Sequence, residues 1–208
     1  MYIVFEGIDG SGKTTMVEKV ARWMFDKDIK LTLAREPLYG AEDYLLRYYI
    51  KCLDDLEDSD AFETLYYAMD RLINKTDIVK SLNDGRIVLS DRSYISSLMY
   101  QEDTDFVRNV NKYVIEPDLV IYFNVDTDVA FSRLKKRDGK ISVSLEQLRE
   151  YNEKYNDLFW GNAAKCLINN KNGNILTVNA NNSVDEVFES IIYSLEEHYP
   201  EIFNKGED

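Results

Sequence analysis

The chain has 208 residues, 45% of them hydrophobic, which is enough for one well-buried domain but too little for two ordinary ones. Its formal net charge of -13 excludes nonspecific binding to nucleic acid or to an anionic membrane, because both need a basic surface. No apolar stretch approaches the length that crosses a bilayer, and no secretory leader stands before the first motif. We expect a single domain over residues 1–208, located in the cytoplasm, with neither nucleic acid nor a membrane as a partner.

Five short apolar runs, each bounded by polar segments, predict the strands of one sheet. They are Tyr2 to Phe5, Leu31 to Ala34, Ile87 to Leu89, Leu119 to Val125 and Ile175 to Val178. Apolar residues at helical spacing predict helices between these runs, over residues 15–26, 62–79 and 184–195. Capping boxes are expected at Ser183 with Glu186 and at Ser144 with Gln147. Strands that alternate with helices predict an α/β fold with a parallel sheet and helices on both faces.

A G-x-x-x-x-G-K-[ST] motif follows the first strand directly and opens the first helix, which is the setting that a phosphate loop requires. The segment reads Gly7-Ile8-Asp9-Gly10-Ser11-Gly12-Lys13-Thr14-Thr15. Its glycines let backbone N–H groups turn around a phosphate, with the N-terminus of a helix behind them. Lys13 is expected to reach the outer phosphates of a nucleotide, and the Thr14 hydroxyl to ligate its magnesium. A plain glycine-rich turn would have no use for Lys13 and Thr14 at these positions.

Two further motifs follow strands, at the edge where ligands collect in such sheets. Arg35-Glu36-Pro37 follows the second strand, and Asp91-Arg92 follows the third. Asp91 stands where a strand-terminal acid helps to hold magnesium, and the guanidinium groups of Arg35 and Arg92 suit phosphate oxygens. The second helix adds a planar aromatic and another guanidinium one turn apart, within Tyr66 to Arg71.

Five basic residues and a single acid fall within residues 133–140 of this otherwise acidic chain. The basic residues are Arg133, Lys135, Lys136, Arg137 and Lys140. On its own, such a cluster is explained by a solvated helix end, where cations favour the helix dipole. Beside a phosphate loop, the cluster favours a mobile basic flap over a bound nucleotide, which we place around residues 133–143.

These motifs together resemble the thymidylate kinase family in order, spacing and content. The matching segments are Phe5 to Thr15, Arg35 to Pro37, Tyr67 to Arg71 and Asp91 through Gln101, so the match covers almost the whole chain. The resemblance implies the P-loop fold of the nucleoside monophosphate kinases. It also implies transfer of the γ-phosphoryl group of MgATP to the 5′-phosphate of dTMP, which gives dTDP and ADP. ATP and Mg²⁺ are the implied cofactors, and a homodimer is typical of relatives.

The resemblance further implies roles for individual residues. The ATP phosphates are assigned to Gly7, Ile8, Asp9, Gly10, Ser11, Gly12, Lys13, Thr14, Thr15 and Arg133, and the metal to Thr14 and Asp91. Residues assigned to dTMP are Asp9, Glu36, Pro37, Tyr39, Tyr67, Arg71, Arg92, Ser97, Tyr100, Gln101 and Tyr155. Catalysis is assigned to Lys13, Arg92, Asp9 and Arg137.

Within the acceptor set, the resemblance is more specific for five positions. Arg71 and Arg92 match arginines that hold the acceptor phosphate. Tyr67 matches the aromatic that stacks on thymine, and Tyr155 matches a tyrosine near the nucleoside. Pro37 matches a proline that follows a cis peptide bond in relatives.

The chain departs from the family pattern in three places, one of them the flap, which is shorter than usual and has Lys140 where relatives often place an arginine. Some relatives carry an arginine inside the phosphate loop, but Asp9, Gly10 and Ser11 include none. The transition-state cation is therefore expected from the flap, at Arg133, Arg137 or Lys140. Leu38-Tyr39-Gly40 stands in place of the commoner paired glycines, at a position that belongs to the acceptor pocket.

Three alternatives fit part of the pattern. A deoxynucleoside kinase shares the phosphate loop and an arginine after the third strand, but it needs a carboxylate base, for which Glu36 or Asp91 would serve. Arg71 in addition to Arg92 favours an acceptor that already carries phosphate. A regulatory GTPase is indicated by N-K-x-D at residues 74–77, yet these residues continue a helical rhythm, whereas that motif belongs after a buried strand. An inactive binding module would bind ATP and dTMP without turnover.

Overall fold

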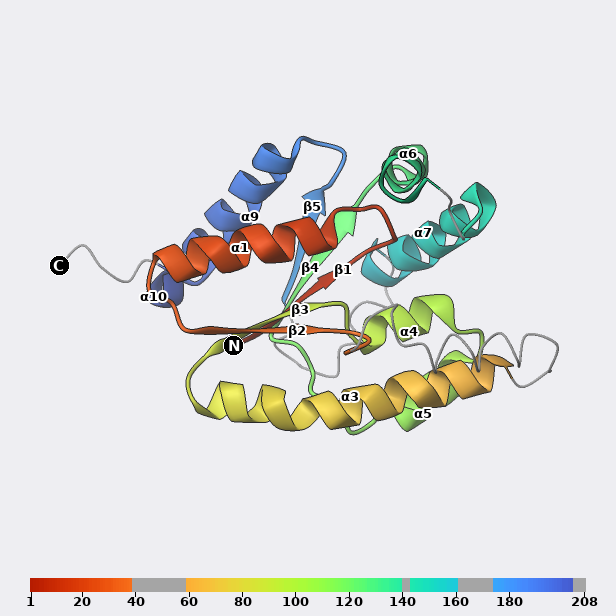
Figure 1. Cartoon of the computed structure of the whole chain (residues 1–208), viewed down its shortest axis with the longest axis horizontal. Helices are drawn as coiled ribbons and strands as arrows, with labels where there is room; N and C mark the ends of the chain where they lie inside the picture. The colour runs from red at the N-terminus through yellow and green to blue at the C-terminus, as the bar shows by residue number, and fades with distance from the viewer. Residues whose placement is uncertain (39–58, 140–142, 161–173, 204–208) are drawn as a thin grey trace.

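The computed structural model describes residues 1–38, 59–139, 143–160 and 174–203. In this part of the chain five strands form one sheet in the order β2-β3-β1-β4-β5, with every neighbouring pair parallel (Figure 1). The strands are β1 (Tyr2–Glu6), β2 (Leu31–Arg35), β3 (Ile87–Asp91), β4 (Leu119–Asn124) and β5 (Asn174–Asn179). The predicted parallel sheet is confirmed.

Helices cover both faces of this sheet, as the alternation of elements predicted. One face carries α1 (Lys13–Asp26) and α9 (Val184–His198), and the other carries α3 (Ser59–Asn83), α4 (Tyr94–Tyr100) and α5 (Thr104–Val110) (Figure 1). The short α10 (Pro200–Phe203) packs against α9. Beyond the carboxyl ends of the strands lie α6 (Thr127–Asp138) and α7 (Leu145–Trp160), which pack on each other (Figure 1).

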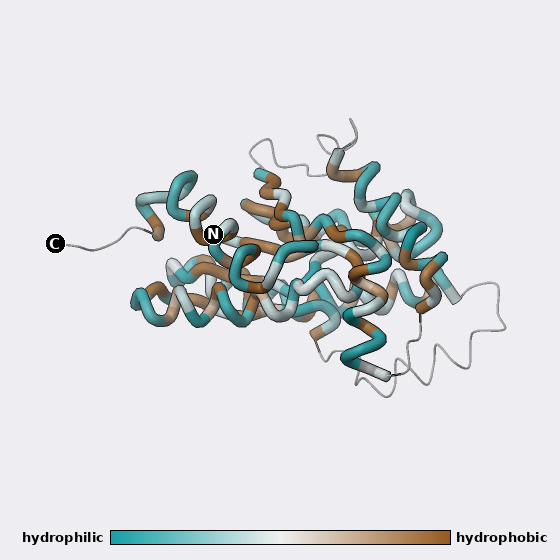
Figure 2. The backbone as a smooth tube through the Cα atoms, turned by 90° about the horizontal axis from the view of Figure 1, so that it is seen from above, coloured by the Kyte–Doolittle hydropathy of each residue, from teal (hydrophilic) through white to brown (hydrophobic). Residues whose placement is uncertain are grey.

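The central strands are apolar along most of their length because both of their faces are covered. All five residues of β1 and of β3 are buried. In Figure 2, segments coloured as hydrophobic pass through the interior of the molecule. The predicted strands stop short at the polar residues Glu6 and Asp91. In the structure Glu6 still pairs with Tyr122, and Asp91 with Phe5, so both strands extend to these acids.

Smaller differences concern the ends of elements. The first helix begins at Lys13 rather than Thr15, which places two residues of the phosphate loop in its first turn. Both capping boxes are confirmed. The Ser183 hydroxyl and the Glu186 carboxylate satisfy each other's backbone N–H groups, and Ser144 and Gln147 do the same at 2.9 and 3.1 Å.

The long helix α3 has an unusual distribution of polarity. Its predicted apolar stripe faces solvent, with Leu65, Met69, Leu72 and Ile73 between 45% and 57% exposed. Its opposite side buries polar residues, among them Asp70, Arg71 and Asn74. An amphipathic helix ordinarily buries its apolar stripe, so this helix turns a polar face toward the interior and leaves an apolar face uncovered.

Candidate active site

The phosphate loop connects β1 to α1 in backbone conformations that glycine adopts easily. Gly7, Gly10 and Gly12 all have positive φ, at 146°, 82° and 101°. Gly10 also lies against α6, because a Cβ atom there would stand 2.4 Å from the Ala130 carbonyl oxygen. The loop therefore needs glycine at this position for both backbone conformation and space.

Lys13 begins α1 and folds back over the loop. Its Nζ donates hydrogen bonds to the carbonyl oxygens of Gly7 and Ile8, at 2.8 Å each. The residue is only 5% exposed, and burial lowers the pKa of its ammonium group to about 8. A phosphate group brought into the loop would offer this buried cation a stronger acceptor than the two carbonyl groups.

The oxygen atoms predicted to hold magnesium lie together. Asp91 ends β3, and its Oδ2 accepts a hydrogen bond of 2.5 Å from the Thr14 hydroxyl in the first turn of α1. A hydroxyl and a carboxylate are oxygen ligands of the kind Mg²⁺ prefers, and Mg²⁺ usually takes its remaining ligands from phosphates and water. The two residues thus fit the predicted magnesium site.

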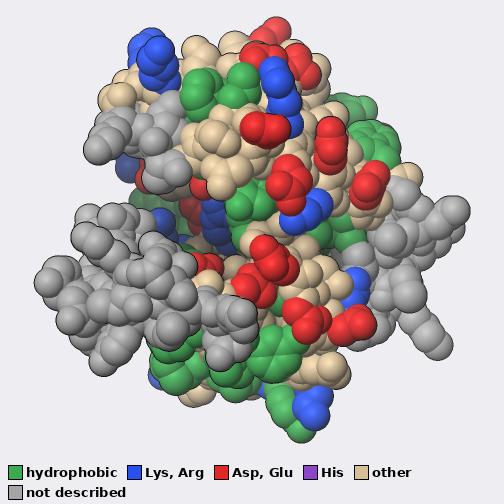
Figure 3. Space-filling view, turned by 90° about the vertical axis from the view of Figure 1, so that its right-hand side faces the viewer, with side chains coloured by type: hydrophobic (Ala, Val, Ile, Leu, Met, Phe, Trp, Pro, Cys, Tyr) green, Lys and Arg blue, Asp and Glu red, His purple; other side chains and the backbone are tan. Residues whose placement is uncertain are grey.

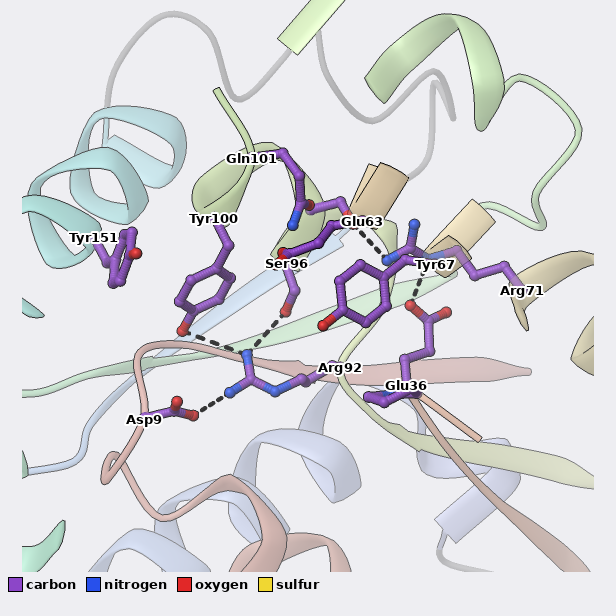
Figure 4. Close-up of a pocket in the computed structure, with 12 residues that line it drawn as sticks. Asp9, Glu36, Glu63, Tyr67, Arg71, Arg92, Ser96, Tyr100, Gln101 and Tyr151 are labelled. Carbon is purple, nitrogen blue, oxygen red and sulfur yellow. Dashed lines mark hydrogen bonds and ion pairs between the residues drawn. The ribbon is translucent and has the colours of Figure 1, made fainter. Parts of the chain in front are cut away.

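Arg92 joins the phosphate loop to the neighbouring cavity. Its guanidinium pairs with the Asp9 carboxylate in the loop, and it donates to Ser96 Oγ at 3.1 Å and to the Tyr100 hydroxyl at 3.4 Å (Figure 4). The Arg92 guanidinium lowers the pKa of Asp9 below its ordinary value, although burial of Asp9 raises it. The positive charges of Lys13 and Arg137 also lower the pKa of Asp9. Four charged groups are therefore concentrated around the loop.

A cavity of about 300 Å³ opens beside Arg92. Its lining residues are Asp9, Glu36, Pro37, Glu63, Tyr67, Arg71, Arg92, Ser96, Ser97, Tyr100, Gln101 and Tyr151. The end of the molecule that carries the phosphate loop faces the viewer in Figure 3, where the surface is hollowed and Lys or Arg side chains lie inside. Small-molecule sites in proteins start at about this volume, so the cavity suits a ligand of nucleotide size.

The cavity has a guanidinium group at each end. Arg92 lies beside Asp9, whereas Arg71 lies on the far side of the Tyr67 ring (Figure 4). Arg71 donates to Glu36 Oε2 at 2.5 Å, to Ser97 Oγ at 2.7 Å and to a third acceptor, Asn111 Oδ1, at 3.0 Å. Both arginines that the resemblance assigns to the acceptor phosphate thus line the cavity, each held by different partners.

The buried polar face of α3 holds the segment that follows β2. Asp70 accepts from the Leu38 backbone N–H at 2.9 and 3.1 Å, and Asn74 donates to the Arg35 carbonyl oxygen at 3.5 Å. Between Arg35 and Leu38, the Glu36–Pro37 peptide bond is cis. These contacts bring Glu36 and Pro37 to the cavity, whereas Arg35 is exposed and is not among its lining residues.

Comparison with known proteins gives a consistent answer. The sequence model of the family described as thymidylate kinase matches residues 5–191. The thymidylate kinase of Finegoldia magna is 31% identical over 202 residues, which cover 92% of this chain and 96% of that protein. A probable thymidylate kinase of Thermococcus onnurineus is 30% identical over 95% of this chain and 98% of its own length. One from Methanobrevibacter smithii is 38% identical over 66% of this chain and 71% of its own length.

This chain belongs to the thymidylate kinase family. Its fold is accordingly that of the P-loop nucleoside monophosphate kinases, as the resemblance implied. The family activity is an ATP-dependent phosphotransfer, so ATP is the phosphoryl donor.

Most residues that the thymidylate kinase resemblance assigns to dTMP meet at the cavity. Tyr155 does not line it, because its buried hydroxyl donates to Glu6 and its ring packs edge-on against Tyr100, behind the cavity wall. Tyr151, one turn earlier on α7, lines the cavity instead, and the centre of its ring lies 4.6 Å from the centre of the Tyr100 ring. Tyr39 lies outside the described residues.

Three lining residues were not predicted from the sequence: Glu63, Ser96 and Tyr151. Helical spacing could have found two of them. Glu63 stands one turn before Tyr67 on α3, and Tyr151 stands one turn before Tyr155 on α7, so each shares a face with a predicted residue. Ser96 neighbours the predicted Ser97 on α4 and is distinguished by its contacts in the structure, among them the hydrogen bond from Arg92.

The described part of the predicted basic flap begins within α6 of this thymidylate kinase family member. Arg133 to Arg137 form the last turns of α6, where cations also suit the helix dipole. Arg133 donates to the Ala180 carbonyl oxygen, just after β5, at 2.9 Å. Arg137 lies close enough to the loop to affect the pKa of Asp9. Lys140 lies outside the described residues.

Proposed function

We propose that this protein transfers the γ-phosphoryl group of MgATP to dTMP through the cavity described above, giving dTDP and ADP. One observation carries the mechanism: the Arg92 side chain contacts both the phosphate loop, through Asp9, and the wall of the cavity, through Ser96 and Tyr100. Donor and acceptor are both polyanions, and phosphoryl transfer requires mainly alignment and charge stabilisation from the protein. A guanidinium between the two sites supplies both.

On the donor side, Gly7 to Thr15 hold the ATP phosphates through backbone N–H groups and the start of α1. Lys13 exchanges the carbonyl oxygens of Gly7 and Ile8 for phosphate oxygens and stabilises the charge on the transferred group. Thr14 and Asp91 would hold Mg²⁺, which neutralises charge between the phosphates when it is bound.

The flap supplies the transition-state cation, and Arg137 is the best placed of its described residues. Arg137 contributes to the lowering of the pKa of Asp9 in the phosphate loop, which supports this assignment. Arg133 already donates to the chain after β5, so we assign it to the nucleotide rather than to the transferred group.

On the acceptor side, we assign different roles to the two arginines. Arg92 binds the phosphate of dTMP because it adjoins the phosphate loop. A nucleotide oriented in this way places its base toward the other end of the cavity, where the Arg71 guanidinium and Ser97 stand beside Tyr67 (Figure 4). Tyr67 stacks on the base, and Arg71 faces its edge, where the thymine carbonyl groups are acceptors.

The geometry disfavours the alternatives. A kinase acting on a 5′-hydroxyl needs a carboxylate base, but Glu36 is paired with Arg71 at the far end of the cavity and Asp91 is bonded to Thr14. The N-K-x-D residues of a GTPase would follow a strand, and here they lie inside α3, where the Asn74 amide bonds to the Arg35 carbonyl oxygen.

ADP formation by the purified protein with MgATP tests the proposal, with dTMP compared with dUMP, dCMP, dAMP, dGMP and thymidine. We expect dTMP to give the highest kcat/KM. The Lys13→Ala variant serves as the control for contaminating kinases and should be inactive. Turnover of thymidine alone would favour a nucleoside kinase, and binding of ATP and dTMP without turnover would favour a binding module.

We also propose that the protein forms a homodimer through the exposed apolar stripe of α3. Leu65, Met69, Leu72 and Ile73 recur at helical spacing and form one exposed apolar face, which is a feature of interaction surfaces. Light scattering should give the mass of a dimer for the wild type and of a monomer for Met69→Glu. Lys80→Glu, on an exposed position of the same helix, is the matched control and should stay dimeric.

The cytoplasmic location stays a prediction, to be tested by cell fractionation. The structure adds one related observation: none of the described helices has the combination of length and apolarity that spanning a membrane requires.

A further inference from the structure

A fully buried carboxylate stands behind the wall of the active site. Glu6 is the last residue of β1, directly before the phosphate loop, and is 0% exposed. Its Oε1 accepts from the Ser93 backbone N–H at 2.8 Å and from the Ser93 hydroxyl at 2.7 Å. Its Oε2 accepts from the Ser96 and Tyr155 hydroxyls, at 2.9 Å each. Four donors thus compensate the burial of a group that is costly to remove from water.

The donors of Glu6 belong to the surroundings of Arg92. Ser96 gives its proton to Glu6, and the same oxygen accepts the hydrogen bond of 3.1 Å from the Arg92 guanidinium. A serine hydroxyl has one proton and two lone pairs, so a proton fixed on Glu6 leaves a lone pair for Arg92. Glu6 therefore fixes the orientation of the Ser96 hydroxyl, whose free lone pair accepts from Arg92.

The second acceptor of Arg92 rests on the same carboxylate. Arg92 donates to the Tyr100 hydroxyl at 3.4 Å and lies over the Tyr100 ring at 5.3 Å. The Tyr100 ring packs edge-on against Tyr155, whose hydroxyl is bound to Glu6. Ser93, which holds the other oxygen of Glu6, is also the N-cap of α4, the helix that carries the two hydroxyl acceptors of Arg92, Ser96 and Tyr100.

We propose that Glu6 is a positioning residue that aligns the Arg92 guanidinium with the phosphate loop. Its backbone continues into Gly7 of the donor site, and its side chain fixes the α4 groups that hold Arg92 on the acceptor side. One residue thereby links the two sites whose relative position decides the rate of transfer. The inference rests on the proposed function of Arg92 as the ligand of the acceptor phosphate.

A glutamine at this position tests the idea with little change in shape. Glu6→Gln retains one oxygen for the Ser93 N–H, but its amide N–H group faces the Ser96 and Tyr155 hydroxyls. The two hydroxyls then lose their shared acceptor, and the reorientation of Ser96 would displace the oxygen that accepts from Arg92. We expect kcat/KM for dTMP to fall by about 10- to 100-fold, the loss that misplacement by about 1 Å causes, with an unchanged KM for ATP.

A double-mutant cycle separates positioning from a structural role. If Glu6 acts through Arg92, the loss caused by Glu6→Gln should shrink to less than about threefold in an Arg92→Lys background, because coupled residues are not additive. Equal losses in both backgrounds, or full activity of Glu6→Gln, would overturn the proposal.

Two further variants keep the test decisive. If Glu6→Gln does not fold, Tyr155→Phe removes a single donor from Glu6 and should show the same coupling to Arg92→Lys. Tyr122→Phe is its control, because it loses a hydroxyl bond of 2.9 Å to Asn156 in the same aromatic stack without reaching Arg92, and it should keep wild-type activity. A wild type that does not turn over dTMP would overturn the proposed function alone. The same cycle, run on dTMP binding by calorimetry, would then decide the role of Glu6.

Discussion

Nucleotide binding should weaken as the pH rises above about 8, because the phosphate loop depends on one buried ammonium group. Burial lowers the pKa of Lys13 from 10.5 to about 8, and its Nζ contacts the carbonyl oxygens of Gly7 and Ile8 in the unliganded loop. A bound phosphate is an anion beside this group and favours its charged form, so the pKa rises on binding. Below pH 8 the lysine is already charged, and binding needs no proton.

The size of the effect follows from the linkage between binding and protonation. Between the pKa of the free protein, about 8, and the higher pKa of the complex, binding takes up one proton. The association constant then falls about tenfold for each pH unit, which equals about 1.4 kcal/mol. We therefore expect about the same affinity for MgADP at pH 6.5 and 7.5, and about a tenfold weaker affinity at pH 9 than at pH 7.

Isothermal titration calorimetry with MgADP in buffers of different ionisation enthalpy measures both the affinity and the proton uptake. The phosphate groups lose their last proton near pH 6, so they contribute little above pH 7. Lys13→Met should bind weakly at every pH, with no proton uptake, and thus controls for other groups that titrate in this range. A wild-type affinity that is constant from pH 7 to pH 9.5 would refute the coupling between the protonation of Lys13 and phosphate binding.

Three substitutions test other parts of the site. Gly10→Ala should lower the free energy of unfolding by about 3 kcal/mol in urea denaturation, because its φ is 82° and its Cβ would meet the Ala130 carbonyl oxygen at 2.4 Å. Gly85→Ala, at φ 70° with no atom within 4 Å of the added Cβ, should lose only about 1 kcal/mol, and equal losses would contradict the contact argument. Thr14→Ala should raise the Mg²⁺ concentration for half-maximal activity about tenfold, while an unchanged requirement would exclude the hydroxyl as a ligand. Arg71→Lys should reduce the preference for dTMP over dCMP in kcat/KM about tenfold, because an ammonium group lacks the planar fork, and an unchanged ratio would argue against recognition of the base.

Much of the fold follows from local sequence patterns. The three central strands are continuous apolar runs because helices cover both of their faces, so their positions are visible in the sequence. The polar ends of these strands are not visible in this way. Glu6 and Asp91 lie outside the apolar runs that mark these strands, yet both extend their strands through backbone pairing. The chemistry of the site begins at these two residues, where polarity and strand geometry conflict.

In helix α3, the spacing of apolar residues predicts the helix but not which of its faces is buried. The spacing of Leu65, Met69 and Leu72 correctly predicts a helix, and a single-chain argument would bury this stripe. The structure instead buries Asp70 and Arg71, because their hydrogen bonds to the Leu38 N–H and to Glu36 satisfy polar groups that would otherwise be costly to bury. The partners of these bonds lie more than 30 residues away, so no local pattern reveals them.

The same limit explains why the two arginines of the cavity could not be distinguished from sequence. A guanidinium group pairs most strongly with a phosphate, but it can also donate to a carbonyl oxygen, so the residue type alone does not assign either arginine to one acceptor. Their roles diverge only through their partners. Arg92 is paired with Asp9 in the loop that binds the donor, whereas Arg71 is held by Glu36 and Ser97. These partners support the proposal made above, in which Arg92, next to the loop, binds the phosphate of dTMP and Arg71 distinguishes one base from another.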